Sequence, residues 1–124
     1  MKLELRLNEI TIKESGANLQ KSIEMVGGKL SLTNQRLVFK SHNASIQTDL
    51  TEIQLTDIAS LEKCWIKLLG IIPIMPNLLD VNTKDGKKFS FVLFDRNHWR
   101  SAIWSQKTAV TRVEHGQLMQ GRAC

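Results

Sequence analysis

The sequence predicts a mainly-β domain in which about seven short antiparallel strands fold back on themselves and one C-terminal α-helix closes the structure. Three observations support this fold class. Apolar and polar residues alternate, as they do in strands, through most of the first three quarters of the 124-residue chain. Turn-forming residues separate these alternating runs. A helical period appears only after residue 95, so the strand–helix alternation of a parallel α/β sheet is missing.

The N-terminal part is expected to form short strands separated by turns. Leucines alternate with charged residues over 3–7, and isoleucines resume the alternation over 10–12. Residues 14–18 (ESGAN) are expected to form a turn. A further alternation at 23–25 precedes the glycine pair at 27–28, which is the clearest turn signal in this part of the chain.

A hairpin is predicted over residues 29–40. Its Thr-Asn-Gln triplet supplies the turn, and Leu37 and Phe39 are expected on one face of the second strand. Two further short strands are expected at 53–55 and 58–66, where apolar residues again dominate.

A second hairpin is predicted over residues 78–94. The Asp-Gly dipeptide at 85–86 favours a tight primed turn, because glycine tolerates the positive φ that this turn requires. Phe89 and Phe91 are expected on one face. Residues 92–94 are all apolar, so the end of this strand is expected to be buried on both sides.

The closing helix is predicted over residues 96–115. Asp95 is suited to the N-cap position, where its carboxylate can accept hydrogen bonds from the first free N–H groups. Trp99 and Ile103 begin an apolar stripe of helical period, and Gly116 is a plausible stop.

The chain length fits a single domain, which we expect to cover residues 1–115, followed by a flexible tail at 116–124. The net charge is +5, and the whole basic excess lies after residue 57, which permits contact with an acidic partner or lipid headgroup. The N-terminus lacks the apolar core of a signal peptide, and no run reaches the roughly 18 apolar residues that span a bilayer. We therefore expect a cytoplasmic protein, with peripheral membrane contact as an option.

The motifs that would support an enzyme are missing. No serine or cysteine lies in a nucleophile motif, and the glycine pair belongs to neither type of phosphate-binding loop. The cysteines and histidines show no zinc-ligand spacing, and the aspartates show no calcium-loop spacing. We expect a non-enzymatic protein without a metal or cofactor.

Five lysines form the candidate headgroup site: Lys63, Lys67, Lys84, Lys87 and Lys88. The last three surround the Asp-Gly turn, and each lysine near an anionic surface contributes about 1 kcal/mol of attraction. The first two would join them if the loops share one end of the domain. The simpler interpretation is a solvated hairpin whose charges prevent edge aggregation. Binding of nucleic acid is not expected, because the aromatic residues sit at core-like positions.

The most apolar segment is KLLGIIPIMPNLL, residues 67–79. Exposing its eight large apolar side chains to water would forgo on the order of 10 kcal/mol, comparable to a domain's stability. Three environments remain open. The segment folds into its own core around a bend at Pro73 and Pro76, forms a self-association or partner interface, or dips into a lipid interface. The candidate membrane or partner contacts are Leu69, Ile71, Ile72, Ile74 and Met75.

Several motifs, taken in order, resemble the GRAM domain family over roughly residues 14–105. The first lies in GGKLSLTNQRLVF, and further matches follow at 53–63, at 81–94 and at the start of the helix. The residues that carry the family pattern are Gly28, Leu30, Leu32, Thr33, Arg36, Leu37, Phe39, Asp57, Gly86, Phe91 and Trp99.

This resemblance implies a pleckstrin-homology-like fold, with two near-orthogonal antiparallel sheets capped by a C-terminal helix. It also implies a non-catalytic binding module that in some relatives associates with membranes or phosphoinositides and in others with proteins. The sequence departs from many lipid-binding relatives because its first hairpin offers only Lys29. For Arg36 we expect a structural role, pairing with an acid such as Asp57 or covering apolar neighbours with its stem.

We therefore expect a module that associates with anionic membrane lipid surfaces. The alternative is a protein-interaction or self-association module, a homo-oligomer included, that uses the apolar segment at 68–79 and binds no lipid.

Overall fold

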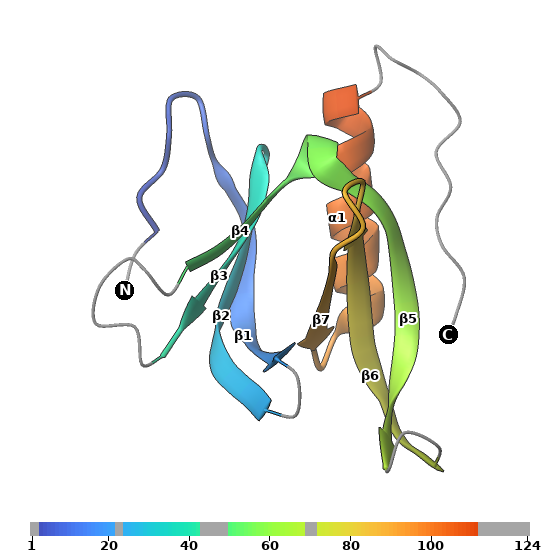
Figure 1. Ribbon diagram of the computed structural model, residues 1–124. Coiled ribbons are helices and arrows are strands. Elements are labelled where there is room, and N and C mark those ends of the chain that lie inside the picture. The colour runs from blue at the N-terminus through green and yellow to red at the C-terminus, as the bar shows by residue number, and fades with distance from the viewer. Residues whose placement is uncertain (1–2, 22–23, 43–49, 69–71, 112–124) are drawn as a thin grey trace.

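The computed structural model describes residues 3–21, 24–42, 50–68 and 72–111. Its strands and helices follow one another in this order: β1 (Thr11–Lys21), β2 (Glu24–Thr33), β3 (Arg36–Ser41), β4 (Leu50–Gln54), the short 3-10 helix η2 (Leu55–Asp57), β5 (Ile58–Leu68), β6 (Ile72–Thr83), β7 (Lys88–Val92) and α1 (Arg96–Thr111). The expected mainly-β fold with one C-terminal helix is confirmed (Figure 1).

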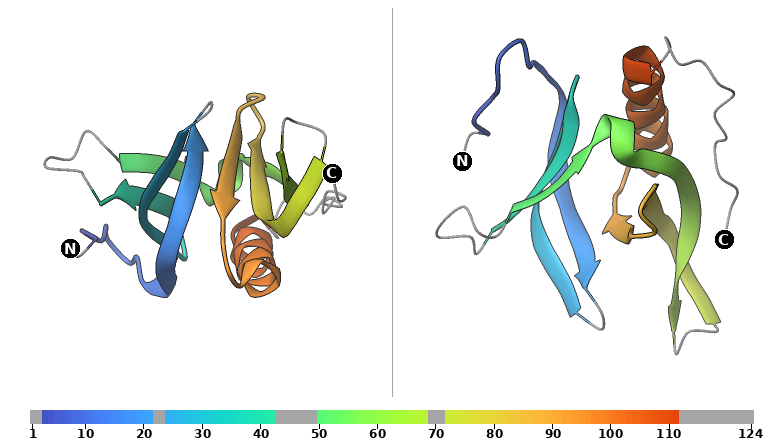
Figure 2. Two further views of the ribbon diagram at one scale, coloured as in Figure 1. Left: turned by 90° about the horizontal axis from the view of Figure 1, so that it is seen from below. Right: turned by 45° about the horizontal axis from the view of Figure 1, so that its top comes forward.

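The strands form one antiparallel seven-stranded sheet in the order β4-β3-β2-β1-β7-β6-β5. We expected two near-orthogonal sheets, and this detail is wrong, because β1 pairs with β7 from Asn18 opposite Val92 to Gln20 opposite Ser90. The sheet folds at this short contact, so that β1–β4 and β5–β7 stand as two facing walls (Figure 2). The helix α1 packs against η2, β5 and β6 and closes the space between the two walls.

The hydrophobic core fills the space between the two walls and the helix. Leu30, Leu32, Leu37 and Phe39 come from β2 and β3, and the ring of Phe39 lies 5.9 Å from that of Phe91 on β7. Further core residues include Leu61, Leu79, Val81, Trp99 and Ile103. The indole N–H of Trp99 donates a hydrogen bond to Ser15 Oγ at 3.2 Å, which joins the helix to β1. The predicted core face of the first hairpin and the start of the helical stripe are therefore confirmed.

Three expectations for the N-terminal half are wrong. Residues 3–10 do not form a strand, and Leu5 and Leu7 are exposed, because polar contacts rather than apolar packing hold this segment over the sheet. Residues 14–18 lie inside β1, where pairing with β2 and β7 overrides their turn preference. The glycines at 27–28 lie inside β2.

A close approach of two strands explains Gly28. A Cβ added there would lie 2.3 Å from the carbonyl oxygen of Lys40 and 2.7 Å from Cζ of Phe39. The position therefore requires the absence of a side chain rather than a reversal of the chain direction.

Both predicted hairpin turns are confirmed. The first joins β2 to β3, and the second joins β6 to β7, with Gly86 at φ +90°. The start of α1 at Arg96 is also as expected. Phe94 was expected to be buried but is fully exposed, because β7 ends at Val92 and the chain turns toward the helix directly after the buried Leu93. In the second half of the helix Lys107 is buried and Val110 is exposed, so the expected apolar stripe does not continue there.

The apolar segment at 67–79 belongs to the hairpin of β5 and β6. The chain reverses between residues 68 and 72, not at the expected bend at Pro73 and Pro76, which lie within β6. Leu78 and Leu79 are buried, so the end of the segment belongs to the protein's own interior. Within the described residues, no helix is long and apolar enough to cross a membrane.

Some expectations lie outside the described residues. These are the proposed contacts at Leu69 and Ile71, the end of the helix after residue 111 and the tail at 116–124. For Lys67, Ile72, Ile74 and Met75 the structure describes only the path of the backbone.

Candidate functional site

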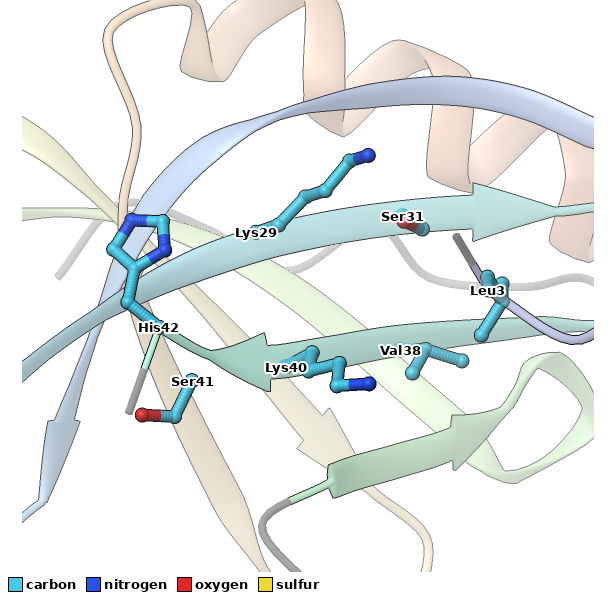
Figure 3. A pocket seen from close by; sticks show the side chains of 7 residues that line it. All are labelled: Leu3, Lys29, Ser31, Val38, Lys40, Ser41 and His42. Atoms are coloured by element: carbon cyan, nitrogen blue, oxygen red, sulfur yellow. The ribbon is translucent and has the colours of Figure 1, made fainter. Parts of the chain in front are cut away.

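A basic pocket lies on the outer face of β2 and β3 (Figure 3). Alternation along these strands directs Leu30 and Phe39 into the core, so Lys29 and Lys40 emerge on the opposite face. The cavity has a volume of about 210 Å³. It is lined by Leu3, Lys29, Ser31, Val38, Lys40, Ser41 and His42, and we call it the basic pocket.

Lys29 and Lys40 lie directly opposite each other in the β2–β3 register. Like charges at such positions repel each other, so an anion between them would relieve the repulsion. In Figure 3 the Lys29 side chain extends from β2 toward β1, and the Lys40 side chain runs along β3. Glu14 on β1 is near, and its Oε1 lies 3.2 Å from Lys29 Nζ. Both partners of this ion pair are partly exposed, and such pairs contribute about 0–1 kcal/mol.

The remaining lining residues suit a phosphate group. Ser31 lies on the same face as Lys29, and its hydroxyl donates a hydrogen bond to Glu14 Oε2 at 3.1 Å, whereas the side chain of Ser41 points away from the pocket in Figure 3. His42 closes one end of the pocket, where its backbone N–H donates to the carbonyl of Gly27 at 3.0 Å. Val38 and Leu3 form an apolar wall on the other side. The arrangement can hold an anionic group, but it contains no pair of groups arranged for acid–base or nucleophilic chemistry.

The lysines expected around the β6–β7 turn are found there. Lys84, Lys87 and Lys88 are all exposed. Acidic groups accompany them, since Asp85 lies at the centre of the turn and Lys88 Nζ lies 3.6 Å from Asp80 Oδ2. The hydrogen bond from the Thr83 hydroxyl lowers the pKa of Asp85. The negative charge of this carboxylate partly offsets the lysines around it.

The other two expected lysines do not join that turn. Lys63 lies opposite Leu79 in the middle of β5, and its Nζ donates to Oδ1 of Asn97 on α1 at 3.1 Å. Lys67 lies opposite Pro73, near the far end of the same hairpin. Because the β5–β6 and β6–β7 connections lie at opposite ends of β6, the structure does not bring the five lysines together.

Arg36 pairs with Glu9 and Glu52 rather than with the Asp57 that we expected. Its Nε lies 2.8 Å from Glu9 Oε2 and its Nη2 lies 3.0 Å from Glu9 Oε1, while Nη1 reaches Glu52 at 3.2 Å. Nη2 also donates to the carbonyl of Glu4 at 2.9 Å. The pKa of Glu9 is lowered to about 2, and the hydrogen bonds from Arg36 are the main cause. These contacts hold residues 3–10 across β3, which brings Leu3 to the basic pocket.

The basic pocket was missed by sequence reasoning, although a signal for it exists. Lys29 and Lys40 fall on the polar face of a hairpin that the sequence does predict, and their direct opposition depends on its register. The MVGGKL stretch contains no second basic residue beside Lys29, and Lys40 comes from the neighbouring strand. Within the described residues, no group of three His, Cys, Asp or Glu side chains is placed to hold a metal ion.

The GRAM domain family matches residues 1–104. No curated protein matches the sequence. Among solved structures, the C-terminal domain of a protein from Leishmania infantum is 20% identical with a TM-score of 0.67, covering 82% of this chain and 86% of that one. The Vps36 N-terminal PH domain is 18% identical with a TM-score of 0.68, covering 88% and 86%. The Slm1 PH domain, solved in complex with phosphoserine, is 13% identical with a TM-score of 0.54, covering 77% and 91%. These likenesses show the pleckstrin-homology-like fold.

Proposed function

This chain belongs to the GRAM domain family, and on that premise we propose that it is a non-catalytic binding module for anionic membrane lipid surfaces. The basic pocket is the proposed headgroup site. The proposal rests mainly on one observation, the opposition of Lys29 and Lys40 across β2 and β3 in a cavity that also holds two serines and His42.

The chemistry of the pocket supports a phosphate-bearing ligand. Two ammonium groups on neighbouring strands attract a phosphate, and the Ser31 hydroxyl would donate to it once it turns away from Glu14 Oε2. The complex of the Slm1 PH domain with phosphoserine supports the idea that a domain of this fold accommodates such a group. The weak pair of Lys29 with Glu14 does not oppose this, because a phosphate can replace the carboxylate at little cost.

If the basic pocket faces a membrane, the β5–β6 hairpin is proposed to contact the same membrane. Its apolar sequence at 68–75 would dip into the lipid interface, with Leu69, Ile71, Ile72, Ile74 and Met75 as contacts. Lys67, close to the chain reversal, would lie at headgroup level, and Lys63 further from it. A cytoplasmic protein that reaches membranes peripherally fits this mode of binding.

The lysines of the β6–β7 turn would have a secondary role. Asp85 and Asp80 offset them, so Lys84, Lys87 and Lys88 would add only long-range attraction to the surface. The proposal therefore predicts that the two lysines of the basic pocket contribute more to membrane binding than the three lysines of the β6–β7 turn.

A protein-interaction module is the alternative. The β5–β6 hairpin projects from the body of the domain (Figure 1), and a projecting apolar hairpin also suits a second copy of the chain or another protein. That function would need no anionic lipid.

Vesicle flotation with paired charge variants tests the proposal. The full chain is mixed with phosphatidylcholine vesicles, with or without phosphatidylserine, at low and at physiological salt. We expect binding only to the anionic vesicles, weakened by salt. Replacing Lys29 and Lys40 together by glutamine should weaken binding by about 30-fold, since each lysine contributes about 1 kcal/mol.

The matched control replaces Lys84, Lys87 and Lys88 by glutamine, which removes more charge from the other group of lysines. This variant should bind within about twofold of the wild type. Equal losses in both variants would contradict a site at the basic pocket, and a wild type that binds no vesicle would contradict the membrane function. A thermal melt of each variant checks that the fold is intact.

A further inference from the structure

Phe94 is a large apolar side chain that the fold leaves completely in water. It lies in the connection between β7 and α1, with a relative exposure of 101%, while the preceding Leu93 is 1% exposed. Exposed single apolar residues are common on protein surfaces, so exposure alone carries no conclusion. Two further observations single out Phe94: its backbone is held in place, and it borders a groove.

The backbone on both sides of Phe94 is firmly held. The N–H of Leu93 donates to the carbonyl of Asn77 at 3.0 Å, and the N–H of Trp99 donates to the carbonyl of Asp95 at 3.0 Å. Asp95 also lies 3.2 Å from Lys13 Nζ. The aromatic ring is therefore presented to solvent by a fixed connection, as a preorganised contact requires.

Phe94 borders a groove that shares one lining residue with the basic pocket. Its lining includes Gly16, Gly28 and His42 beside Phe94. His42 lines both cavities. At Gly16 an added Cβ would meet only the carbonyl oxygen of Gly28, at 3.9 Å, so the outer face of β1 is bare at this point.

We propose that Phe94 inserts into the interfacial region of the same anionic bilayer whose headgroups bind in the basic pocket. Aromatic side chains favour the headgroup level of a membrane, where the ring leaves water. One electrostatic and one apolar contact together anchor a peripheral protein better than either alone. The cationic pocket beside the groove favours an anionic bilayer over a protein as the occupant. This inference rests on the proposed membrane function.

Leu7 provides a matched control at the other end of the same wall. It is 85% exposed, and the Gln35 side-chain N–H donates to its carbonyl at 2.9 Å. Gln35 precedes β3, whereas His42 follows it, so Leu7 and the basic pocket's His42 lie at opposite ends of that strand. An exposed leucine there should not reach a membrane that contacts Phe94.

The experiment compares Phe94→Ala, Phe94→Trp and Leu7→Ala with the wild-type chain. Flotation uses phosphatidylcholine–phosphatidylserine vesicles over a range of salt concentrations. Phe94→Ala should bind about tenfold more weakly, with the salt dependence of the wild type retained, because only the apolar contact is lost. Leu7→Ala should bind as the wild type does.

Phe94→Trp should bind as tightly as the wild type and report its position. On addition of vesicles its emission should shift to shorter wavelength beyond any shift of the wild-type tryptophans, and lipids brominated on their acyl chains should quench it. In the same series, the variant in which glutamine replaces both Lys29 and Lys40 measures the contribution of the electrostatic contact.

The outcomes separate the two proposals. If Phe94→Ala floats as the wild type does, or if the added tryptophan shows no shift, the insertion of Phe94 is wrong while the membrane function stands. If the wild type itself binds no vesicle, the proposed function fails and the inference fails with it. A loss in Phe94→Ala that Leu7→Ala matches would also overturn the inference, because it would reflect general apolar contact.

Discussion

Arg36 and Glu9 form a bidentate ion pair in which both side chains are almost fully buried. Two nitrogens of the guanidinium lie 2.8 and 3.0 Å from the two carboxylate oxygens, in the planar geometry that arginine and carboxylates favour. Glu9 also accepts a 2.6 Å hydrogen bond from the Thr33 hydroxyl. The pair joins residues 3–10 to β3 where apolar packing does not, since Leu5 and Leu7 face solvent.

Glu9→Gln should destabilise the domain by about 3 kcal/mol. Removing one partner leaves a buried charge without full compensation, although Arg36 retains Glu52 and the carbonyl of Glu4. The midpoint of urea unfolding, monitored by tryptophan fluorescence, measures this loss. Glu4→Gln is the control, because Glu4 contacts Arg36 only through its backbone carbonyl. A similar loss in both variants would contradict the assigned role of the buried pair.

The same pair predicts how stability depends on pH. The pKa of Glu9 is lowered from 4.5 to about 2, with Arg36 as the main cause. A lowered folded-state pKa contributes stability that is fully present above pH 4.5 and is lost as the pH falls toward 2. The difference of about 2.5 pH units corresponds to about 3 kcal/mol. Unfolding free energy measured between pH 6 and pH 2 should fall accordingly in the wild type.

Glu9→Gln should remove this part of the acid sensitivity, because glutamine does not titrate. Its unfolding free energy should fall less steeply than that of the wild type below pH 4.5. Parallel curves for the two proteins would assign the acid sensitivity to other carboxylates.

Local patterns predicted the elements that depend on nearby residues. The hairpin of β2 and β3, the Asp-Gly turn before β7 and the start of α1 each follow from alternation, turn residues or a change of period. The strap of residues 3–10 could not be predicted in this way. Its conformation depends on Arg36, which is 27 positions away from Glu9, and alternation of leucine with charge describes a strand equally well.

The basic pocket could be predicted from the sequence only in part. The hairpin that carries Lys29 and Lys40 was predicted, but their opposition depends on the register, which only the paired strands fix. The glycines at 27–28 were misinterpreted for a related reason. Glycine permits a turn, but it also permits close contact between strands, and sequence alone does not distinguish the two.

Gly28→Ala should therefore destabilise the domain by about 1–3 kcal/mol or more, because the new Cβ would meet the backbone of Lys40 at 2.3 Å. Backbone atoms cannot move aside as a flexible side chain can. Gly16→Ala is the control, since its Cβ would meet only one atom, at 3.9 Å, and it should match or slightly exceed the wild type. Thermal unfolding of the two variants measures the contrast. Equal stability would mean that β2 and β3 do not approach closely at Gly28.

The β5–β6 hairpin offers the sharpest distinction between the two candidate functions. Ile72 pairs with Leu68 beside the chain reversal, at the end of a hairpin that projects from the domain (Figure 1). A charged residue there is incompatible with a lipid interface and with an apolar protein interface alike. Ile72→Asp should weaken flotation with anionic vesicles about tenfold. It should leave the thermal unfolding of the domain unchanged, and Ile72→Val should behave as the wild type.

The oligomeric state in the absence of lipid shows whether Ile72→Asp disrupts a lipid interface or a protein interface. Under the membrane function the wild type should be monomeric by light scattering over a wide concentration range, and Ile72→Asp should not alter its mass. A concentration-dependent dimer that Ile72→Asp dissociates would instead support self-association through the hairpin. In that case lipid binding, if observed, should be independent of residue 72, because the basic pocket on β2 and β3 would act without the hairpin.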